Sequence, residues 1–188
     1  KRLARACGDD VTGDVHLGDW GLQMGLIITE MKKRKPELIY FRDDAPGDMD
    51  AYPKEAPFTL AELEEVYPCA SAKSKEDEAY KAEALEATHL LQMGRPGYRA
   101  MWLKIMELSV ADLKKNYERL DVSFDLWNGE STVQPYIAPM VEKLKAEGYA
   151  HYDQGALVID VAEPDDKIEI PPCMVLNSDG ASLYNTTD

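Results

Sequence analysis

The chain has 188 residues and a formal net charge of −14, with 45% apolar and 30% charged residues. These values are typical of a folded protein with one domain, or with one domain and a small insertion. The acidity excludes a protein that binds nucleic acid through a basic surface of its own, and it disfavours binding to anionic membranes.

The first part of the chain is predicted to alternate between short elements. Residues 1–7 suit the end of a helix that a glycine stops, and residues 9–15 suit a strand of poor alternation. A turn at 16–21 has two glycines around an Asp-Trp pair. Apolar residues at helical spacing then predict a helix that ends in the basic run 32–35, where the helix dipole favours positive charge. Residues 37–41 are predicted to form a strand.

The middle of the chain is predicted to be mainly helical. Residues 42–57 contain three prolines and many acids, which predicts a loop. A capping-box pattern at Thr59 predicts a short helix that ends at the Tyr67-Pro68 pair. A second helix is predicted to start at Ser74, and a third runs over residues 98–119. These two helices form an α-hairpin with one apolar face.

The last third mixes short strands with one helix. Residues 122–125 alternate as a strand, and the Asn128-Gly129 dipeptide predicts a turn. A helix is predicted over residues 134–147 and a β-hairpin over residues 149–161. Residues 173–176 are predicted to form a buried strand. The whole pattern predicts a mixed α/β fold.

The closing residues, 177–188, are predicted to form a turn and a short strand. Because side chains alternate along a strand, Tyr184 and Asp188, four positions apart, would share a face. A phenol and a carboxylate on one face suit a cationic ligand. An ordinary hairpin with a polar exposed face shows the same alternation, so the spacing alone leaves both interpretations open.

Cysteines and histidines give no metal or disulfide pattern. The chain has three of each, scattered along its length: Cys7, Cys69, Cys173, His16, His89 and His151. The odd number of cysteines and the lack of a CxxC pair suit a reducing cytosol, so we expect a cytoplasmic protein without a metal site. No apolar run reaches the length that spans a bilayer. Both ends look cut, which suggests a fragment of a longer protein.

Three strings give a resemblance to a known family. They are His16-Leu-Gly-Asp-Trp-Gly-Leu-Gln-Met-Gly25, Tyr117-Glu-Arg-Leu-Asp-Val-Ser-Phe-Asp125 with Gly129-Glu-Ser131, and Ser178-Asp-Gly-x-x-x-Tyr184-x-Thr-x-Asp188. In this order and at these distances they resemble motifs of arginyl-tRNA synthetases, which are class I aminoacyl-tRNA synthetases. The resemblance runs from the first residues to the last.

The resemblance implies an α/β fold, namely an incomplete class I nucleotide-binding (Rossmann-like) fold that carries a mixed helical and β-hairpin insertion. Residues 1–41 would be part of the nucleotide-binding fold and residues 42–172 the insertion. Residues 173–188 would be a returning strand with the amino-acid-binding motif. The implied activity is that of an arginine–tRNA ligase, which joins arginine to ATP and then transfers it to tRNA.

The resemblance also implies roles for single residues. Tyr184 and Asp188 would bind the guanidinium and ammonium groups of arginine, which agrees with the cation-binding interpretation of their spacing. His16, Asp19, Trp20 and Gln23 would lie near the active-site cleft, and His16 also has a mid-range pKa that suits proton or phosphate chemistry. No residue is assigned as catalytic. The implied substrates are ATP with Mg2+, arginine and tRNA-Arg, with no cofactor held tightly by this chain.

Departures from the family pattern are also visible. Gly13, Val15 and Thr187 stand where the family has Arg, Asn and Arg, which suggests a divergent subgroup. The chain contains no His-x-Gly-His and no Lys-Met-Ser-Lys-like loop, so the usual ATP phosphate contacts are missing. We therefore expect the chain alone to make no adenylate, to charge no tRNA and to bind no nucleic acid.

Two other interpretations remain open. A stand-alone paralogue that kept the fold and lost the signature loops would be a non-catalytic binding or scaffold domain. A cysteinyl-tRNA synthetase would be another class I enzyme, but the zinc-binding Cys/His set of that family is absent.

Overall fold

The computed structural model describes residues 1–178 and 180–187, except the side chain of Tyr184. The chain packs as two units, which are Lys1–Gly18 with Leu126–Asp188, and Asp19–Asp125. The predicted division into residues 1–41, 42–172 and 173–188 does not follow these packing boundaries, and its assignment to parts of a catalytic fold stays a prediction.

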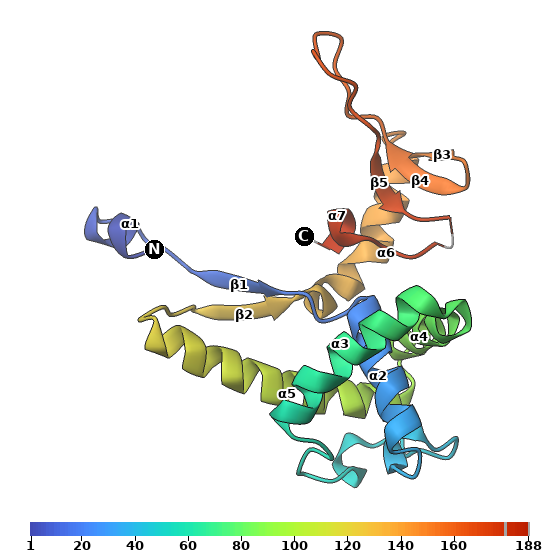
Figure 1. Ribbon diagram of the computed structural model, residues 1–188. Coiled ribbons are helices and arrows are strands. Elements are labelled where there is room, and N and C mark those ends of the chain that lie inside the picture. Colours follow the sequence, from blue (N-terminus) through green and yellow to red (C-terminus); the bar gives the residue numbers. More distant parts are fainter. Residues whose placement is uncertain (179, 188) are drawn as a thin grey trace. The chain divides into compact units, whose positions relative to one another are not determined.

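The unit Asp19–Asp125 is helical (Figure 1). Its four α-helices and two short 3-10 helices are α2 (Leu22–Arg34), η1 (Ile39–Phe41), η2 (Met49–Ala51), α3 (Leu60–Glu76), α4 (Glu78–Gln92) and α5 (Pro96–Arg119). Helix α2 lies against both α3 and α4. Most buried apolar side chains of these helices, with Tyr52 from the connecting segment, form one large core, and Leu26, Ala70, Tyr80 and Ala84 form a second, smaller cluster.

Local sequence signals explain where α3 and α4 begin. The Thr59 hydroxyl accepts a hydrogen bond from the Glu62 amide at 3.2 Å, and the Glu62 carboxylate accepts one from the Thr59 amide at 2.9 Å. This is the predicted capping box. Asp77 caps α4 by accepting hydrogen bonds from the amides of Ala79 and Tyr80. Both caps satisfy amides that have no partner inside the helix.

Close backbone approach holds two helices against their neighbours. A Cβ added to Gly25 of α2 would lie 2.1 Å from both the Ala84 carbonyl oxygen and the Thr88 hydroxyl of α4. A Cβ on Gly97 of α5 would lie 2.0 Å from the Tyr40 carbonyl oxygen. These two glycines are therefore required by packing, since any side chain would clash with main-chain or buried atoms.

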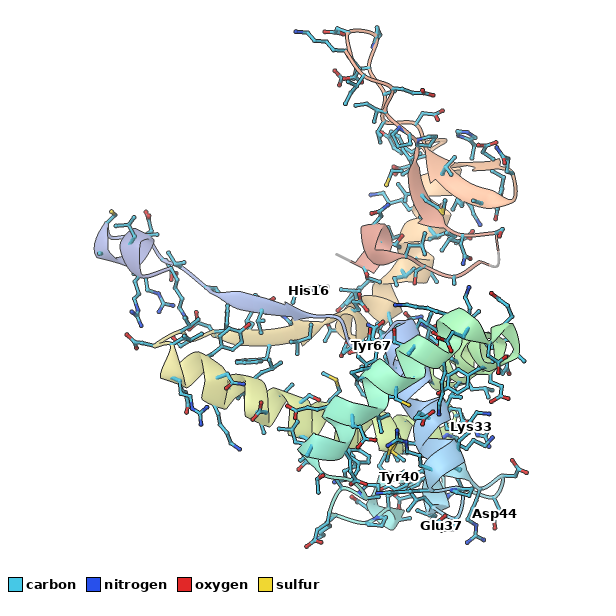
Figure 2. All side chains as sticks on the ribbon, in the orientation of Figure 1. His16, Lys33, Glu37, Tyr40, Asp44 and Tyr67 are labelled. Carbon is cyan, nitrogen blue, oxygen red and sulfur yellow. The ribbon has the colours of Figure 1, made fainter. Side chains whose placement is uncertain are left out.

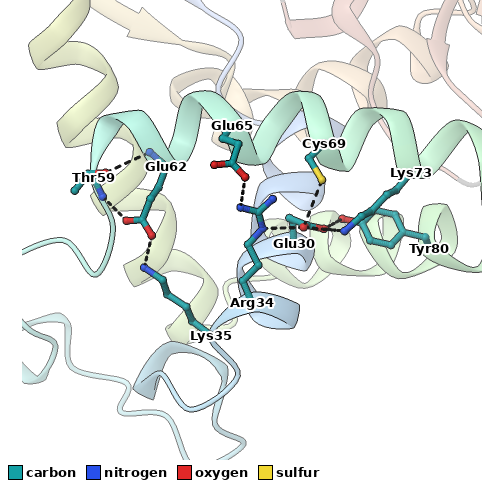
Figure 3. A network of polar contacts seen from close by, with 9 residues as sticks. All are labelled: Glu30, Arg34, Lys35, Thr59, Glu62, Glu65, Cys69, Lys73 and Tyr80. Atoms are coloured by element: carbon teal, nitrogen blue, oxygen red, sulfur yellow. Dashed lines mark hydrogen bonds and ion pairs between the residues drawn. The ribbon is translucent and has the colours of Figure 1, made fainter.

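A buried carboxylate joins three helices of this unit (Figure 3). Glu30 of α2 is 2% exposed. It accepts hydrogen bonds from Arg34 at 2.9 Å, from Lys73 of α3 at 2.9 Å to each oxygen, and from the Tyr80 hydroxyl of α4 at 2.7 Å. Burial alone would raise the pKa of Glu30, but these donors outweigh it and lower the pKa to about 2. A buried charge is tolerated here because every oxygen has partners.

The unit Lys1–Gly18 with Leu126–Asp188 contains two small sheets. Its elements are α1 (Arg2–Ala6), β1 (Asp14–Leu17), β2 (Leu126–Gly129), α6 (Glu130–Ala146), β3 (His151–Asp153), β4 (Ala156–Ile159), β5 (Cys173–Leu176) and α7 (Tyr184–Thr187). Strands β1 and β2 are parallel, and β3, β4 and β5 form an antiparallel sheet in that order. Ile137 and Val141 of α6 pack on Leu157 and Val175 of this sheet.

Three predicted elements in the first two thirds of the chain are wrong. Residues 37–41 contain a 3-10 helix, η1, in place of a strand. Helix α3 continues through Pro68 to Glu76, because buried side chains on both sides of the proline, Val66 and Ala70, keep the helix packed despite the missing amide. The predicted helix start at Ser74 therefore moves to Asp77.

The predictions for residues 122–188 are partly wrong. The strand expected at 122–125 lies at β2, and the Asn128-Gly129 pair ends that strand where a turn was predicted. A turn is not needed, because helix α6 begins directly at Glu130. The hairpin of β3 and β4 and the strand β5 are confirmed. No helix in the described residues is both long and apolar enough to cross a membrane.

Candidate active site

Strands β1 and β2 end side by side. In their parallel register His16 pairs with Asn128, and Leu17 pairs with Gly129. Chain segments leave both strands at this edge, where β2 passes straight into α6. Ligands of open α/β folds bind outside the carboxyl ends of parallel strands, so this edge is the first place to seek a site.

The β1–β2 pair has one polar face. Side chains alternate along β1, so Asp14 and His16 are exposed while Val15 and Leu17 are half-buried. His16 stands on this strand in Figure 2. The predicted site residue His16 therefore lies on the polar face, next to Asn128 of the neighbouring strand.

A contact that was not predicted from the sequence links Asp14 to Asn128 on the polar face. The Asp14 carboxylate accepts a hydrogen bond from the side-chain amide of Asn128 at 2.7 Å and another from its backbone amide at 3.3 Å. Both residues thus lie on the face of His16. The alternation of Asp14 and His16 indicated this face. The turn predicted at Asn128, however, excluded that residue from a strand paired with β1.

Residues Tyr184–Thr187 of the closing motif form the short helix α7, so the predicted strand there is wrong. Tyr184 begins α7, and Asp188 lies outside the described residues. Helix α7 packs against α6 and β5, and the Thr186 hydroxyl donates a hydrogen bond to the Val175 carbonyl oxygen at 2.5 Å. Positions four apart share a face of a helix as they do of a strand. The pairing of Tyr184 with Asp188 stays a prediction.

Residues 19–21 of the Gly-Asp-Trp-Gly turn belong to the helical unit, and hydrogen bonds to the backbone fix them. The indole of Trp102 donates a hydrogen bond to the Asp19 carbonyl oxygen at 2.8 Å, and the Gln92 amide donates one to the Trp20 carbonyl oxygen at 2.9 Å. Asp19 and Trp20 are 4% and 3% exposed. Helices α4 and α5 thus hold the turn that joins β1 to α2.

Aromatic packing explains why the turn carries a tryptophan. The rings of Trp20 and Trp102 meet edge to face, with centroids 5.2 Å apart. The Arg99 guanidinium lies 5.0 Å from the Trp20 ring and 5.1 Å from the Trp102 ring. An edge-to-face pair with a cation over both rings is a stable core arrangement. Trp20 therefore has a clear structural role, whatever it contributes to a site.

Gln23 stands in the first turn of α2 beside a hollow of the helical unit. The hollow has a volume of about 510 Å³ and lies among α2, α3 and α5. Its lining is mainly apolar, with Gln23, Glu64, Tyr67 and Ser109 as the polar members. The predicted residues Asp19, Trp20 and Gln23 thus belong to one unit, while His16 and Tyr184 belong to the other. The described residues contain no group of three or more His, Cys, Asp or Glu arranged to hold a metal ion.

Comparison with known proteins decides the family. The family described as "tRNA synthetases class I (R), catalytic domain" matches residues 1–188. The chain belongs to the class I arginyl-tRNA synthetase family. The resemblance of the three strings is thereby confirmed.

Relatives in this family match the chain along its whole length. It is 61% identical over 188 residues to the arginine–tRNA ligase of Agathobacter rectalis, which covers 100% of this chain and 31% of the relative. It is 54% identical to the ligase of Alkaliphilus oremlandii, covering 100% of this chain and 32% of the relative. The chain therefore spans about a third of the length of these relatives, in agreement with the prediction of a catalytic-domain fragment.

A solved arginyl-tRNA synthetase shares the fold. The crystal structure of the Plasmodium falciparum enzyme matches with a TM-score of 0.69 at 22% identity, over 99% of this chain and 28% of that one. The predicted α/β fold of a class I synthetase is confirmed by this match and by the family assignment.

Proposed function

We propose that this chain is part of the catalytic domain of an arginine–tRNA ligase. Such an enzyme joins the carboxylate of arginine to the α-phosphate of ATP and releases pyrophosphate, and then transfers the arginyl group to the 3′ end of tRNA-Arg. The observation that carries the proposal is the 61% identity over the whole chain to a relative named arginine–tRNA ligase. Action in the cytoplasm is part of the proposal.

Arginine is proposed to bind at the parallel-strand unit. Tyr184 and Asp188 would bind the cationic groups of arginine through a π surface, a hydroxyl and a carboxylate. His16 lies at the carboxyl end of β1 in the same packing unit. Asp19, Trp20 and Gln23 are proposed to lie near the active-site cleft.

ATP, with Mg2+ as its counter-ion, is proposed to be a substrate whose phosphates are held by residues outside these 188. The phosphate-binding signatures His-x-Gly-His and Lys-Met-Ser-Lys do not occur in the sequence. The net charge of −14 likewise makes this chain a poor binder of tRNA by itself. The proposal therefore includes that the 188-residue chain is inactive alone.

Two measurements test the proposal. The full-length protein that contains this chain is expected to exchange pyrophosphate into ATP in the presence of arginine and to charge tRNA-Arg, whereas the 188-residue chain is expected to do neither. Failure of the full-length protein to use arginine would refute the function, and exchange by the short chain would refute its inactivity.

Calorimetric titration of the full-length protein tests the guanidinium site. Arginine is expected to release heat that lysine and citrulline do not, because lysine lacks the planar fork of donors and citrulline lacks the charge. Loss of this difference in a Tyr184→Phe or Asp188→Asn variant would support the assigned residues. Comparable heats from all three amino acids would contradict them.

A further inference from the structure

We propose that Asp14 and Asn128 act as a pair that presents the Asn128 amide oxygen to the cationic part of arginine at the carboxyl end of β1 and β2. Asn128 would touch the substrate, and Asp14 would be a positioning residue that acts through Asn128. This inference rests on the proposed ligase function and adds a substrate contact that neither the sequence motifs nor the family assignment includes.

Hydrogen-bond chemistry fixes how the Asn128 amide is turned. An ionised carboxylate can only accept, so the group that Asn128 directs at Asp14 across 2.7 Å is its NH2. The amide oxygen therefore points away from Asp14. The second hydrogen bond, from the Asn128 backbone amide at 3.3 Å, ties the same carboxylate to the main chain of β2 and restricts its rotation.

The amide oxygen is available to a ligand. Among the described residues, the side chain of Asn128 makes its hydrogen bond to Asp14 and no other. Asn128 is half-buried and pairs in register with the exposed His16. An oriented acceptor next to an exposed imidazole, at the edge where ligands of such folds bind, is suited to an N–H donor.

Charge selects a cationic donor. The Asp14 carboxylate polarises the Asn128 amide from behind, which makes its oxygen a better acceptor, and it adds a negative charge on the same face. Within the proposed function, arginine brings several N–H groups that carry positive charge. A guanidinium or ammonium group therefore suits this face better than a phosphate, which the carboxylate would repel.

A purely structural role is the competing account. Asp14 and Asn128 would then only fix the register of β1 against β2. The two accounts differ in what a mutation changes: loss of a positioned acceptor weakens arginine binding, whereas loss of a register contact lowers stability and affects both small substrates alike.

The test uses steady-state kinetics of pyrophosphate exchange by the full-length ligase. In Asn128→Ala the KM for arginine is expected to rise about 10-fold or more, the typical effect of losing a hydrogen bond to a charged group, while the KM for ATP stays within about twofold. Asp14→Asn is expected to raise the KM for arginine as well, because two facing amides no longer define which end of Asn128 faces the ligand. The double variant is expected to be no worse than Asn128→Ala, since both changes act through one oxygen.

Asp10→Asn is the matched control. It removes the same charge a few residues before β1, at an exposed side chain with no hydrogen bond among the described residues, and its kinetics are expected to equal those of the wild type. If Asn128→Ala does not fold, Asn128→Ser keeps a polar group without the amide oxygen and carries the same expectation.

The outcomes separate the two proposals. An unchanged KM for arginine in the folded Asn128 variants, or equal rises for arginine and ATP with a lowered melting temperature, would overturn the inference and leave the ligase function in place. A wild-type enzyme that does not use arginine would overturn the function itself. A rise in KM that is confined to arginine, and that is no larger in the double variant than in Asn128→Ala, would establish the pair.

Discussion

Replacement of Glu30 by glutamine tests what holds the helical unit together. The variant keeps the shape of the side chain and removes the one charge on which α2, α3 and α4 converge. Lys73 and Arg34 would then lose their main partner, and Tyr80 would donate to a neutral amide. We expect a strongly destabilised unit, because the buried carboxylate accepts hydrogen bonds from Arg34, Lys73 and Tyr80 at once (Figure 3).

The magnitude follows from the pKa of Glu30. Hydrogen bonds from Lys73, Arg34 and Tyr80 outweigh the effect of burial and lower this pKa from 4.5 to about 2. Since one pKa unit corresponds to about 1.4 kcal/mol, the ionised carboxylate contributes about 3 kcal/mol to the free energy of unfolding. That is a large share of the stability of a small folded unit.

The pH dependence has a definite sign. The folded-state pKa of Glu30 is lowered, so its contribution is complete above pH 4.5 and is lost as the pH falls towards about 2. In Glu30→Gln this part of the acid destabilisation should disappear. The difference in unfolding free energy between wild type and variant is therefore expected to be about 3 kcal/mol at pH 7 and to shrink towards pH 2.

Urea unfolding followed by tryptophan fluorescence measures this difference. The helical unit holds Trp20 and Trp102, so a Trp127→Phe background reports on that unit alone. Glu65→Gln is the control. Glu65 also accepts a hydrogen bond from Arg34, at 2.9 Å, but its side chain is 71% exposed, so its loss should cost no more than about 0.5 kcal/mol. A Glu30→Gln variant as stable as the Glu65→Gln control at pH 7 would refute the reasoning.

Three further changes are expected to shift stability, each measured by urea or thermal unfolding. Tyr40→Phe should stabilise the helical unit by about 1 kcal/mol, because the buried Tyr40 hydroxyl has no hydrogen-bond partner among the described residues. Gly25→Ala should destabilise it by about 3 kcal/mol, since the new methyl group would lie 2.1 Å from the Ala84 carbonyl oxygen. Gln154→Asn should stabilise the hairpin of β3 and β4 by about 0.5 kcal/mol, because Gln154 and Gly155 both have positive φ, 48° and 88°, as a type I′ turn requires.

Elements with strong local signals were predictable. Residues close together in the sequence determine the capping box at Thr59 and the hairpin around Gly155. They also determine the cap at Asp77, which was predicted three residues earlier, at Ser74. The basic run 32–35 likewise marks the end of α2, which stops at Arg34. Local chemistry decides these features, so one sequence is enough to find them.

Features decided by distant contacts were not predictable. Pro68 predicts a helix end, yet α3 continues because Val66 and Ala70 are buried on either side of it. Asn128-Gly129 predicts a turn, yet its partner strand is β1, more than a hundred residues earlier in the chain. The Asp14–Asn128 contact depends on that pairing, and no local sequence pattern around either residue predicts it.

The site predicted in the closing motif does not depend on the type of secondary structure that was predicted there. Tyr184 lies in a helix and not in the predicted strand, which changes the period of the side chains from 2 to 3.6 residues. A spacing of four is two full periods of a strand and close to one turn of a helix, so it places two side chains on one face in either element. Spacings of two or three would not have this property, since each suits only one of the two elements. The functional expectation for Tyr184 and Asp188 therefore depends on their separation and not on the strand that first suggested it.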